Sequence, residues 1–197
     1  MKDSKLTDHL SEYSLILGSQ SPRRKELFAG LHIPFLVEVR ETDENYPMNM
    51  NPLEVPEFLA VLKSTPFKQD FRQNDLLITA DTIVLIEDQI LGKPLDYGHA
   101  FEMLRKLSGK KHVVITGVCL TSAEKQITFA DHTDVWFKNL SDDEIDYYLT
   151  HFKPFDKAGS YGVQEWIGYV AIERIEGSYY NVMGLPIQRL YEELLKF

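Results

Sequence analysis

The sequence has only one cysteine, Cys119, among its 197 residues. A single thiol can form neither an internal disulfide nor a cysteine-rich metal site, which excludes a disulfide-bonded secreted scaffold. Basic residues are also few, because 21 Lys and Arg stand against 30 Asp and Glu and leave a net charge of −9. A negative surface repels phosphate backbones and anionic lipids, so we expect neither nucleic acid nor a membrane as the main partner.

Long apolar runs are missing as well. No stretch approaches the 18 consecutive apolar residues that a membrane-spanning helix needs. The polar residues 1–13 lack the apolar segment of a signal peptide, although their apolar residues are at helical spacing. Apolar residues still make up 44% of the chain, which is enough for a sizeable core. We therefore expect a cytoplasmic protein with one folded domain over residues 14–197 and an N-terminal extension over 1–13.

Three common signatures of enzymatic sites are also absent. The six histidines show no His-x-x-x-His or His-x-His spacing, so a zinc site is not expected. No Gly-x-Ser-x-Gly stretch marks a hydrolase nucleophile, and the spacing of a Walker phosphate loop is missing. Any phosphate chemistry must therefore use a different arrangement of residues.

The apolar pattern predicts strands that alternate with helices in the first half and strands that cluster later. Strands are expected over 14–17, 33–39, 76–80, 82–86, 112–121, 126–137 and 168–175. Helices are expected over 22–29, 52–64, 96–107, 142–150 and 186–195. This order favours one α/β unit with a mixed sheet.

The first candidate site is the strand-to-helix junction from Gly18 to Arg24. Ser21 and Pro22 are typical of an N-cap and a first helical residue. The N–H groups of a helix N-terminus favour an anion, and the neighbouring hydroxyls and guanidiniums would add donors. The alternative is that Ser21 only caps the helix while Arg23 and Arg24 are solvated.

The second candidate is Asp81, which interrupts an apolar run. A carboxylate there is costly unless it is paired, hydrogen-bonded or bound to a metal; the alternative is a turn between two hairpin strands. Carboxylates of the acidic loop around Glu44 suit Mg²⁺ with phosphate oxygens completing its shell, although such a loop is commonly just solvated. Lys63 and Lys93 adjoin apolar segments and are individually typical of surface residues with buried stems.

Nine stretches, taken in order, resemble the Maf family of nucleoside triphosphate pyrophosphatases. They are Leu17–Arg24, Asp43-Glu44, Leu59–Lys63, Ala80–Thr82, Gly92–Asp96, Leu104–Gly109 with His112, Thr116–Val118, Asp156–Gln164 and Gly184–Pro186. Together they span most of the chain from Leu15 onward.

The resemblance implies a single elongated α/β domain, with a twisted mixed β-sheet flanked by helices and two lobes around a cleft. It implies a cytoplasmic enzyme, commonly a homodimer, that uses a divalent cation (Mg²⁺ or Mn²⁺). The implied reaction is cleavage of a nucleoside triphosphate to the monophosphate and pyrophosphate. The family is also linked to arrest of septum formation.

Residue by residue, the resemblance implies specific roles. Asp81 falls on the family's proton acceptor, and Glu44 with Asp81 would hold the metal. The implied substrate-binding residues are Ser19, Ser21, Arg24, Lys63 and Lys93. The positions that separate subfamilies hold Arg23, Thr82 and Gln164.

The combination at those three positions resembles the branch that acts on dTTP and UTP, and modified pyrimidine nucleotides are further candidate substrates. The 7-methyl-GTP branch differs at all three. A nucleotide-binding regulator of septum formation without turnover is another alternative. The chain departs mildly from the family pattern, since Gly18 and Thr79 stand where Ala and Gly are preferred, and Ser64 where Ala is preferred.

Overall fold

The computed structural model describes residues 5–197, so residues 1–4 of the predicted extension lie outside the described part of the chain. The strands are β1 (Ser14–Leu17), β2 (Leu36–Val37), β3 (Asp75–Ile86), β4 (Gln89–Leu91), β5 (Lys111–Thr121), β6 (Gln126–Phe137) and β7 (Ile172–Glu176). The helices are α1 (Lys5–His9), α2 (Pro22–Ala29), α3 (Val55–Ser64), α4 (Tyr97–Leu107), α5 (Asp142–Phe152), α6 (Trp166–Val170), α7 (Tyr179–Met183) and α8 (Ile187–Lys196). Two short 3₁₀ turns are η1 (Thr65–Phe67) and η2 (Ala158–Ser160).

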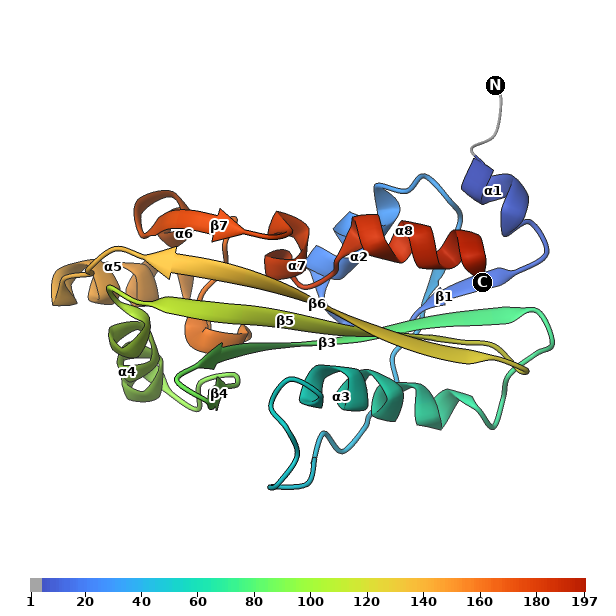
Figure 1. Cartoon of the computed structure of the whole chain (residues 1–197), viewed down its shortest axis with the longest axis horizontal. Coiled ribbons are helices and arrows are strands. Elements are labelled where there is room, and N and C mark those ends of the chain that lie inside the picture. Colours follow the sequence, from blue (N-terminus) through green and yellow to red (C-terminus); the bar gives the residue numbers. More distant parts are fainter. Residues whose placement is uncertain (1–4) are drawn as a thin grey trace. The chain divides into compact units, whose positions relative to one another are not determined.

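The strands form one mixed sheet in the order β2-β1-β3-β5-β6-β7, with β4 paired to β3 (Figure 1). Strand β1 is parallel to both β2 and β3, whereas β4 is antiparallel to β3 and β7 is antiparallel to β6. The predicted α/β class with a mixed sheet is therefore confirmed. Within residues 5–197, no helix combines the length and apolar character needed to cross a membrane.

The chain divides into two compact units that share the long strands. The first unit holds the described residues up to Asp81, with Thr116–Asp131 and Gly184–Phe197. The second unit holds Thr82–Ile115 and His132–Met183. Strands β3, β5 and β6 each contribute residues to both units.

In the first unit, α2 and α8 lie on one side of the sheet and α3 lies on the other (Figure 1). Alternate residues of β3 explain this layering, because successive side chains of a strand point to opposite faces. Leu76 and Ile78 are buried in the core that includes Phe28 of α2 and Leu190 of α8. Leu77 belongs to a separate buried cluster. Both faces of β3 are therefore covered.

Helix α3 approaches the sheet unusually closely. A Cβ atom at Gly117 of β5 would lie 2.2 Å from the backbone carbon of Pro56, so only glycine fits there. Further along α3, the Thr79 hydroxyl donates a hydrogen bond of 2.6 Å to the carbonyl oxygen of Ala60. These two contacts set the position of α3, and with it the position of the side chains on its last turn.

The N-terminal segment is partly built into the core of the first unit. Leu6 and Leu10 are buried with relative exposures of 1% and 4%. Both join the cluster that contains Leu190 and Leu194 of α8. The helical spacing in this segment therefore indicated a real helix, α1.

The second unit packs α4 and α5 against the sheet. Leu104 of α4, Tyr148 of α5 and Phe137 of β6 are all buried in one cluster. The predicted capping box of α5 is confirmed, because the Ser141 hydroxyl and the Glu144 carboxylate accept from each other's backbone N–H groups.

Four predicted strands differ from the observed ones. Strand β3 runs without a break through Asp81, so the predicted pair of strands and the hairpin-turn alternative are wrong. The strand predicted over 33–39 is limited to two residues, because β2 is a sheet edge and pairs only with Ile16 and Leu17. The strand predicted over 168–175 begins only at Ile172, because residues 166–170 form α6.

Candidate functional site

The N-terminus of α2 is held by hydroxyl groups, as predicted. The Ser21 hydroxyl accepts a hydrogen bond of 3.4 Å from the N–H of Arg24, and Pro22 begins the helix. The Ser19 hydroxyl in turn accepts a hydrogen bond of 3.2 Å from the N–H of Ser21. The two serines therefore hold the turn that leads into α2, whose first residues include Arg23 and Arg24.

Arg24 ties three segments of the first unit together. Its Nε and Nη1 atoms donate hydrogen bonds of 2.7 Å each, to the carbonyl oxygens of Gly184 and Ala80. Desolvation lowers the pKa of the Arg24 guanidinium, while the negative charge of Asp81 acts to raise it. Arg24 therefore has a structural role, because it fixes the backbone immediately before Asp81.

Asp81, Lys63 and Glu44 meet at one point on the α3 side of the sheet. Asp81 shares its face of β3 with Thr79 because side chains alternate along a strand. The Lys63 ammonium, on the last turn of α3, lies 2.5 Å from Asp81 Oδ1 and 3.1 Å from Glu44 Oε1. The Asp81 and Lys63 side chains are 12% and 18% exposed, whereas that of Glu44 is 49% exposed. The structure thus brings together three residues that are far apart in the sequence.

Gly18 and Thr79, which both depart from the family pattern, contact each other beside the cluster of Asp81, Lys63 and Glu44. A Cβ atom at Gly18 would lie 2.8 Å from the Cγ2 methyl group of Thr79. The missing side chain at Gly18 therefore makes room for the threonine. Ser64, the third departure, donates a hydrogen bond of 2.7 Å to the carbonyl oxygen of Val61 within α3.

The loop that carries Glu44 is anchored by Arg40. The Arg40 guanidinium donates hydrogen bonds of 2.8 Å to the carbonyl oxygen of Pro66 and 2.7 Å to the carboxylate of Asp70, and it lies over the ring of Phe67. Because Pro66 and Phe67 belong to η1, directly after α3, this contact holds the loop beside the helix that carries Lys63.

The carboxylates of Glu44 and Asp81 are the donors that a divalent cation could use. Across residues 5–197, no group of three or more His, Cys, Asp or Glu is placed to hold a metal ion. Mg²⁺ commonly binds one or two carboxylates and takes its other ligands from water and substrate phosphates. Two carboxylate oxygens that converge from different elements would fit that mode.

The other predicted residues, Thr82, Lys93 and Gln164, belong to the second unit. Thr82 is on β3, and Lys93 is exposed just after β4. The N–H of Gly159 donates a hydrogen bond of 3.1 Å to the carbonyl oxygen of Gly92, so the turn before Gln164 lies beside the segment of Lys93. The Oε1 atom of Gln164 is buried, and no described residue provides it with a hydrogen-bond donor.

Residues 14–197 match the family described as Maf-like protein. The chain belongs to this Maf-like family. It is 51% identical over 195 residues to a Porphyromonas gingivalis protein named dTTP/UTP pyrophosphatase, covering 98% of each chain. It is 54% identical over 187 residues to a protein of the same name from Bacteroides fragilis, covering 94% of this chain and 97% of that one. The solved structure of the Staphylococcus aureus Ham1 protein overlaps 91% of this chain and 99% of its own, with a TM-score of 0.49 and 14% identity.

The turn that carries Gln164 in this Maf-like protein is held by three residues that sequence reasoning did not single out. The buried Tyr148 hydroxyl donates a hydrogen bond to the Glu165 carboxylate and accepts one of 3.0 Å from the N–H of Gly162. The Lys157 ammonium lies 3.0 Å from the same carboxylate. Burial, together with Glu165, raises the pKa of Tyr148, so the phenol remains a donor. Tyr148 and Glu165 are 17 residues apart, and no local pattern pairs them.

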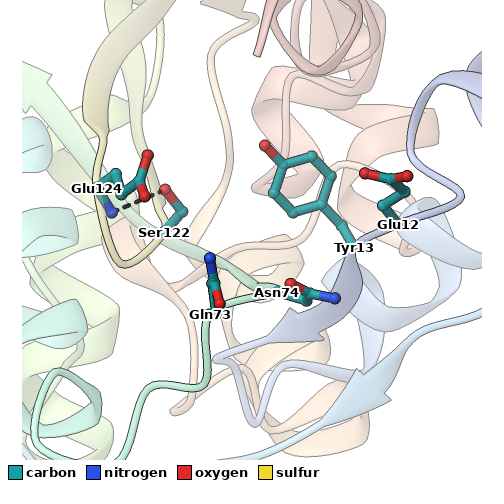
Figure 2. Close-up of a pocket in the computed structure, with 6 residues that line it drawn as sticks. All are labelled: Glu12, Tyr13, Gln73, Asn74, Ser122 and Glu124. Carbon is teal, nitrogen blue, oxygen red and sulfur yellow. Dashed lines mark hydrogen bonds between the residues drawn. The ribbon is translucent and has the colours of Figure 1, made fainter.

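A separate hollow of about 200 Å³ in the first unit of this Maf-like protein contains none of the predicted residues (Figure 2). It is lined by Glu12, Tyr13, Gln73, Asn74, Ser122 and Glu124. Its two charged side chains are both carboxylates, which repel a triphosphate. The hollow is therefore a poor nucleotide site.

Proposed function

We propose that this chain hydrolyses dTTP and UTP to the corresponding monophosphates and pyrophosphate. The observation that carries the proposal is the near full-length similarity, at about half of all positions, to proteins named dTTP/UTP pyrophosphatase. The combination of Arg23, Thr82 and Gln164 also supports the pyrimidine branch. Such an activity would remove pyrimidine nucleotides, including modified ones, from the pool available to nucleic acid synthesis.

Asp81 is proposed as the proton acceptor. In the reaction, a water oxygen forms a bond to the α-phosphorus, the bond to the oxygen that bridges to the β-phosphorus breaks, and pyrophosphate leaves. The water proton passes to the Asp81 carboxylate. The hydrogen bond from Arg24 to the carbonyl oxygen of Ala80 supports this role, because it fixes the backbone that directs the carboxylate.

Lys63, Arg24 and Lys93 are proposed to neutralise the triphosphate, with Ser19 and Ser21 shaping the turn beside it. Positive groups placed where charge develops on the leaving pyrophosphate lower the barrier to its departure. Positive charge on these residues would attract a triphosphate despite the net charge of −9.

Glu44 and Asp81 are proposed to hold a divalent cation, Mg²⁺ or Mn²⁺. When bound, the cation supplies charge neutralisation for the phosphate oxygens. The convergence of the two carboxylates on one point supports the assignment.

Gln164 is proposed to contact the base. The edge of uracil or thymine offers an N3–H donor beside an O4 acceptor, and one side-chain amide can satisfy both. The buried Oε1 atom of Gln164, which no described residue satisfies, is suited to accept from N3–H. Guanine offers two donors on its corresponding edge, which would suit a carboxylate instead.

The deciding experiment is pyrophosphate release from a panel of nucleotides with Mg²⁺ or Mn²⁺. We expect turnover of UTP and dTTP to exceed that of CTP, GTP and 7-methyl-GTP. Preference for 7-methyl-GTP would indicate the other branch of the family. Tight nucleotide binding without turnover would favour the regulator of septum formation.

We propose further that residues 14–197 form the catalytic domain of a cytoplasmic homodimer whose substrate is a nucleotide rather than nucleic acid or a membrane. The family resemblance and the negative net charge support these assignments. Light scattering coupled to size-exclusion chromatography tests the dimer, which requires twice the 22.8 kDa mass of one chain.

A further inference from the structure

The Lys63 ammonium occupies the point on which the two proposed metal ligands converge. It contacts Asp81 Oδ1 at 2.5 Å and Glu44 Oε1 at 3.1 Å. A cation bound by these same two oxygens needs the same position. The ammonium and a divalent ion cannot occupy this position at the same time, because two positive charges at contact distance repel each other.

We propose that Lys63 competes with the divalent cation for the Asp81–Glu44 pair, so that the cation binds strongly only when a triphosphate draws the ammonium away. The inference rests on the proposed function for the nature of the nucleotide, but the competition itself concerns only three side chains. Lys63 thereby couples metal binding to substrate binding.

The charges of the site favour such an exchange. Two neighbouring carboxylates are unfavourable without a cation between them, and Lys63 supplies one positive charge. Arg24 is within electrostatic range of both carboxylates and adds a second. A divalent cation alone would therefore meet a site that is already neutralised. A triphosphate brings the negative charge that both the cation and the displaced ammonium require.

The structure also allows the ammonium to move while its backbone stays in place. The hydrogen bond from Thr79 to Ala60 holds α3 against the sheet, three residues before Lys63. A lysine side chain is a flexible stem with a single point charge, whereas an arginine would hold carboxylates through a rigid fork. The exchange therefore needs rotation of one side chain only.

The test measures Mn²⁺ binding to the whole protein without nucleotide, using the electron paramagnetic resonance signal of unbound Mn²⁺. Lys63→Met keeps the length of the stem and removes the charge, so we expect Mn²⁺ to bind at least ~10-fold more tightly than to wild type. Lys110→Met is the matched control, because Lys110 pairs at 2.8 Å with Glu87 on the exposed surface and its loss changes the net charge equally. The control should bind Mn²⁺ like wild type.

Two further variants make the result specific. Lys63→Met combined with Glu44→Gln should lose the gain in Mn²⁺ affinity, because one of the two carboxylates is removed. Lys63→Gln repeats the charge removal with a polar side chain in case the methionine variant folds poorly. Unchanged Mn²⁺ affinity in a folded Lys63→Met or Lys63→Gln protein overturns the competition. So does a gain that persists in the double variant, because the ion would then bind elsewhere.

Failure of the proposed function has a different signature. A wild-type protein that releases no pyrophosphate from UTP or dTTP refutes the proposed activity, while tighter Mn²⁺ binding by Lys63→Met still supports the competition. A wild-type protein that turns over UTP, with no gain of Mn²⁺ affinity in the Lys63 variants, refutes the competition alone.

Discussion

Replacement of Arg24 by alanine tests whether Arg24 stabilises the fold through its hydrogen bonds or is only a solvated surface residue. The arginine donates two hydrogen bonds of 2.7 Å, to the carbonyl oxygens of Ala80 and Gly184. A hydrogen bond that involves a charged group contributes about 1.5–3 kcal/mol to stability. Losing both should lower the free energy of unfolding by about 3 kcal/mol or more, a large part of the ~5–15 kcal/mol typical of a folded protein.

The assay is urea denaturation of wild type and Arg24→Ala, followed by measurement of kcat/KM for UTP. Lys25→Ala is the matched control, since it removes the same charge from an exposed residue one position away on α2. Arg24→Lys keeps the positive charge but loses the planar fork that reaches two carbonyl oxygens. It should recover only part of the stability.

The activity readout separates the two roles of Arg24. Without the hydrogen bond from Arg24, the backbone at Ala80 would let the Asp81 carboxylate take other orientations. Both kcat and the affinity for substrate should therefore fall. An Arg24→Ala protein as stable as Lys25→Ala would refute the structural role. Arg24 would then be the solvated residue that the sequence left open.

The remaining predictions concern three other residues. Asp81→Asn should remain folded and lower the rate of pyrophosphate release by ~10²–10⁴, as expected for loss of a general base; wild-type turnover would show that Asp81 is not the base. Gln164→Glu should lower kcat/KM for UTP and dTTP by ~10–10³, because an acceptor would then face O4; equal values would mean that Gln164 does not contact the base. Burial lowers the pKa of His112 to about 3 from an ordinary value of 6.5, so the unfolded chain takes up a proton first and stability falls as pH drops from about 6.5 toward 3. Urea denaturation at pH 7 and pH 5 should therefore show a loss for His112→Gln that is smaller than for wild type by about 2 kcal/mol, because about 1.5 pH units of this interval lie below the ordinary pKa, and equal losses would contradict this account.

The elements that the sequence predicted best have their signals within a few residues. Helix α2 begins after its N-cap Ser21 and ends at Gly30, and α5 follows its capping box. Such caps are local hydrogen bonds, so the sequence shows them directly. Strand β3 was divided wrongly because a charged residue within an apolar run resembles a turn. Its carboxylate is accommodated in the strand by a lysine 18 residues earlier, which no local pattern reveals.

The strand predicted over 168–175 begins too early, because it includes Gly168, which lies in α6. A Cβ atom there would lie 1.8 Å from the carbonyl oxygen of Val163, so this glycine serves the close packing of α6 rather than a strand. The candidate site shows the same limit. Residue chemistry alone indicated an anion-binding turn and a costly aspartate, while the grouping of Lys63 and Glu44 with Asp81 required the family resemblance.

The volume shared by Gly18 and Thr79 restricts the order in which these two positions can change. Suppose that one begins from the family's preferred alanine and glycine and moves to the residues of this chain in two steps. Introducing threonine first places a stiff, β-branched side chain against an alanine Cβ at 2.8 Å, and its hydroxyl is already committed to Ala60. Removing the alanine methyl first leaves only a small void, which costs about 1 kcal/mol. The order of substitution that destabilises the fold less therefore passes through an intermediate with glycine at both positions. A chimera that takes only residue 79 from this chain should lose about 1–3 kcal/mol of stability through overpacking, whereas the reciprocal chimera, which takes only residue 18, should lose about 1 kcal/mol or less.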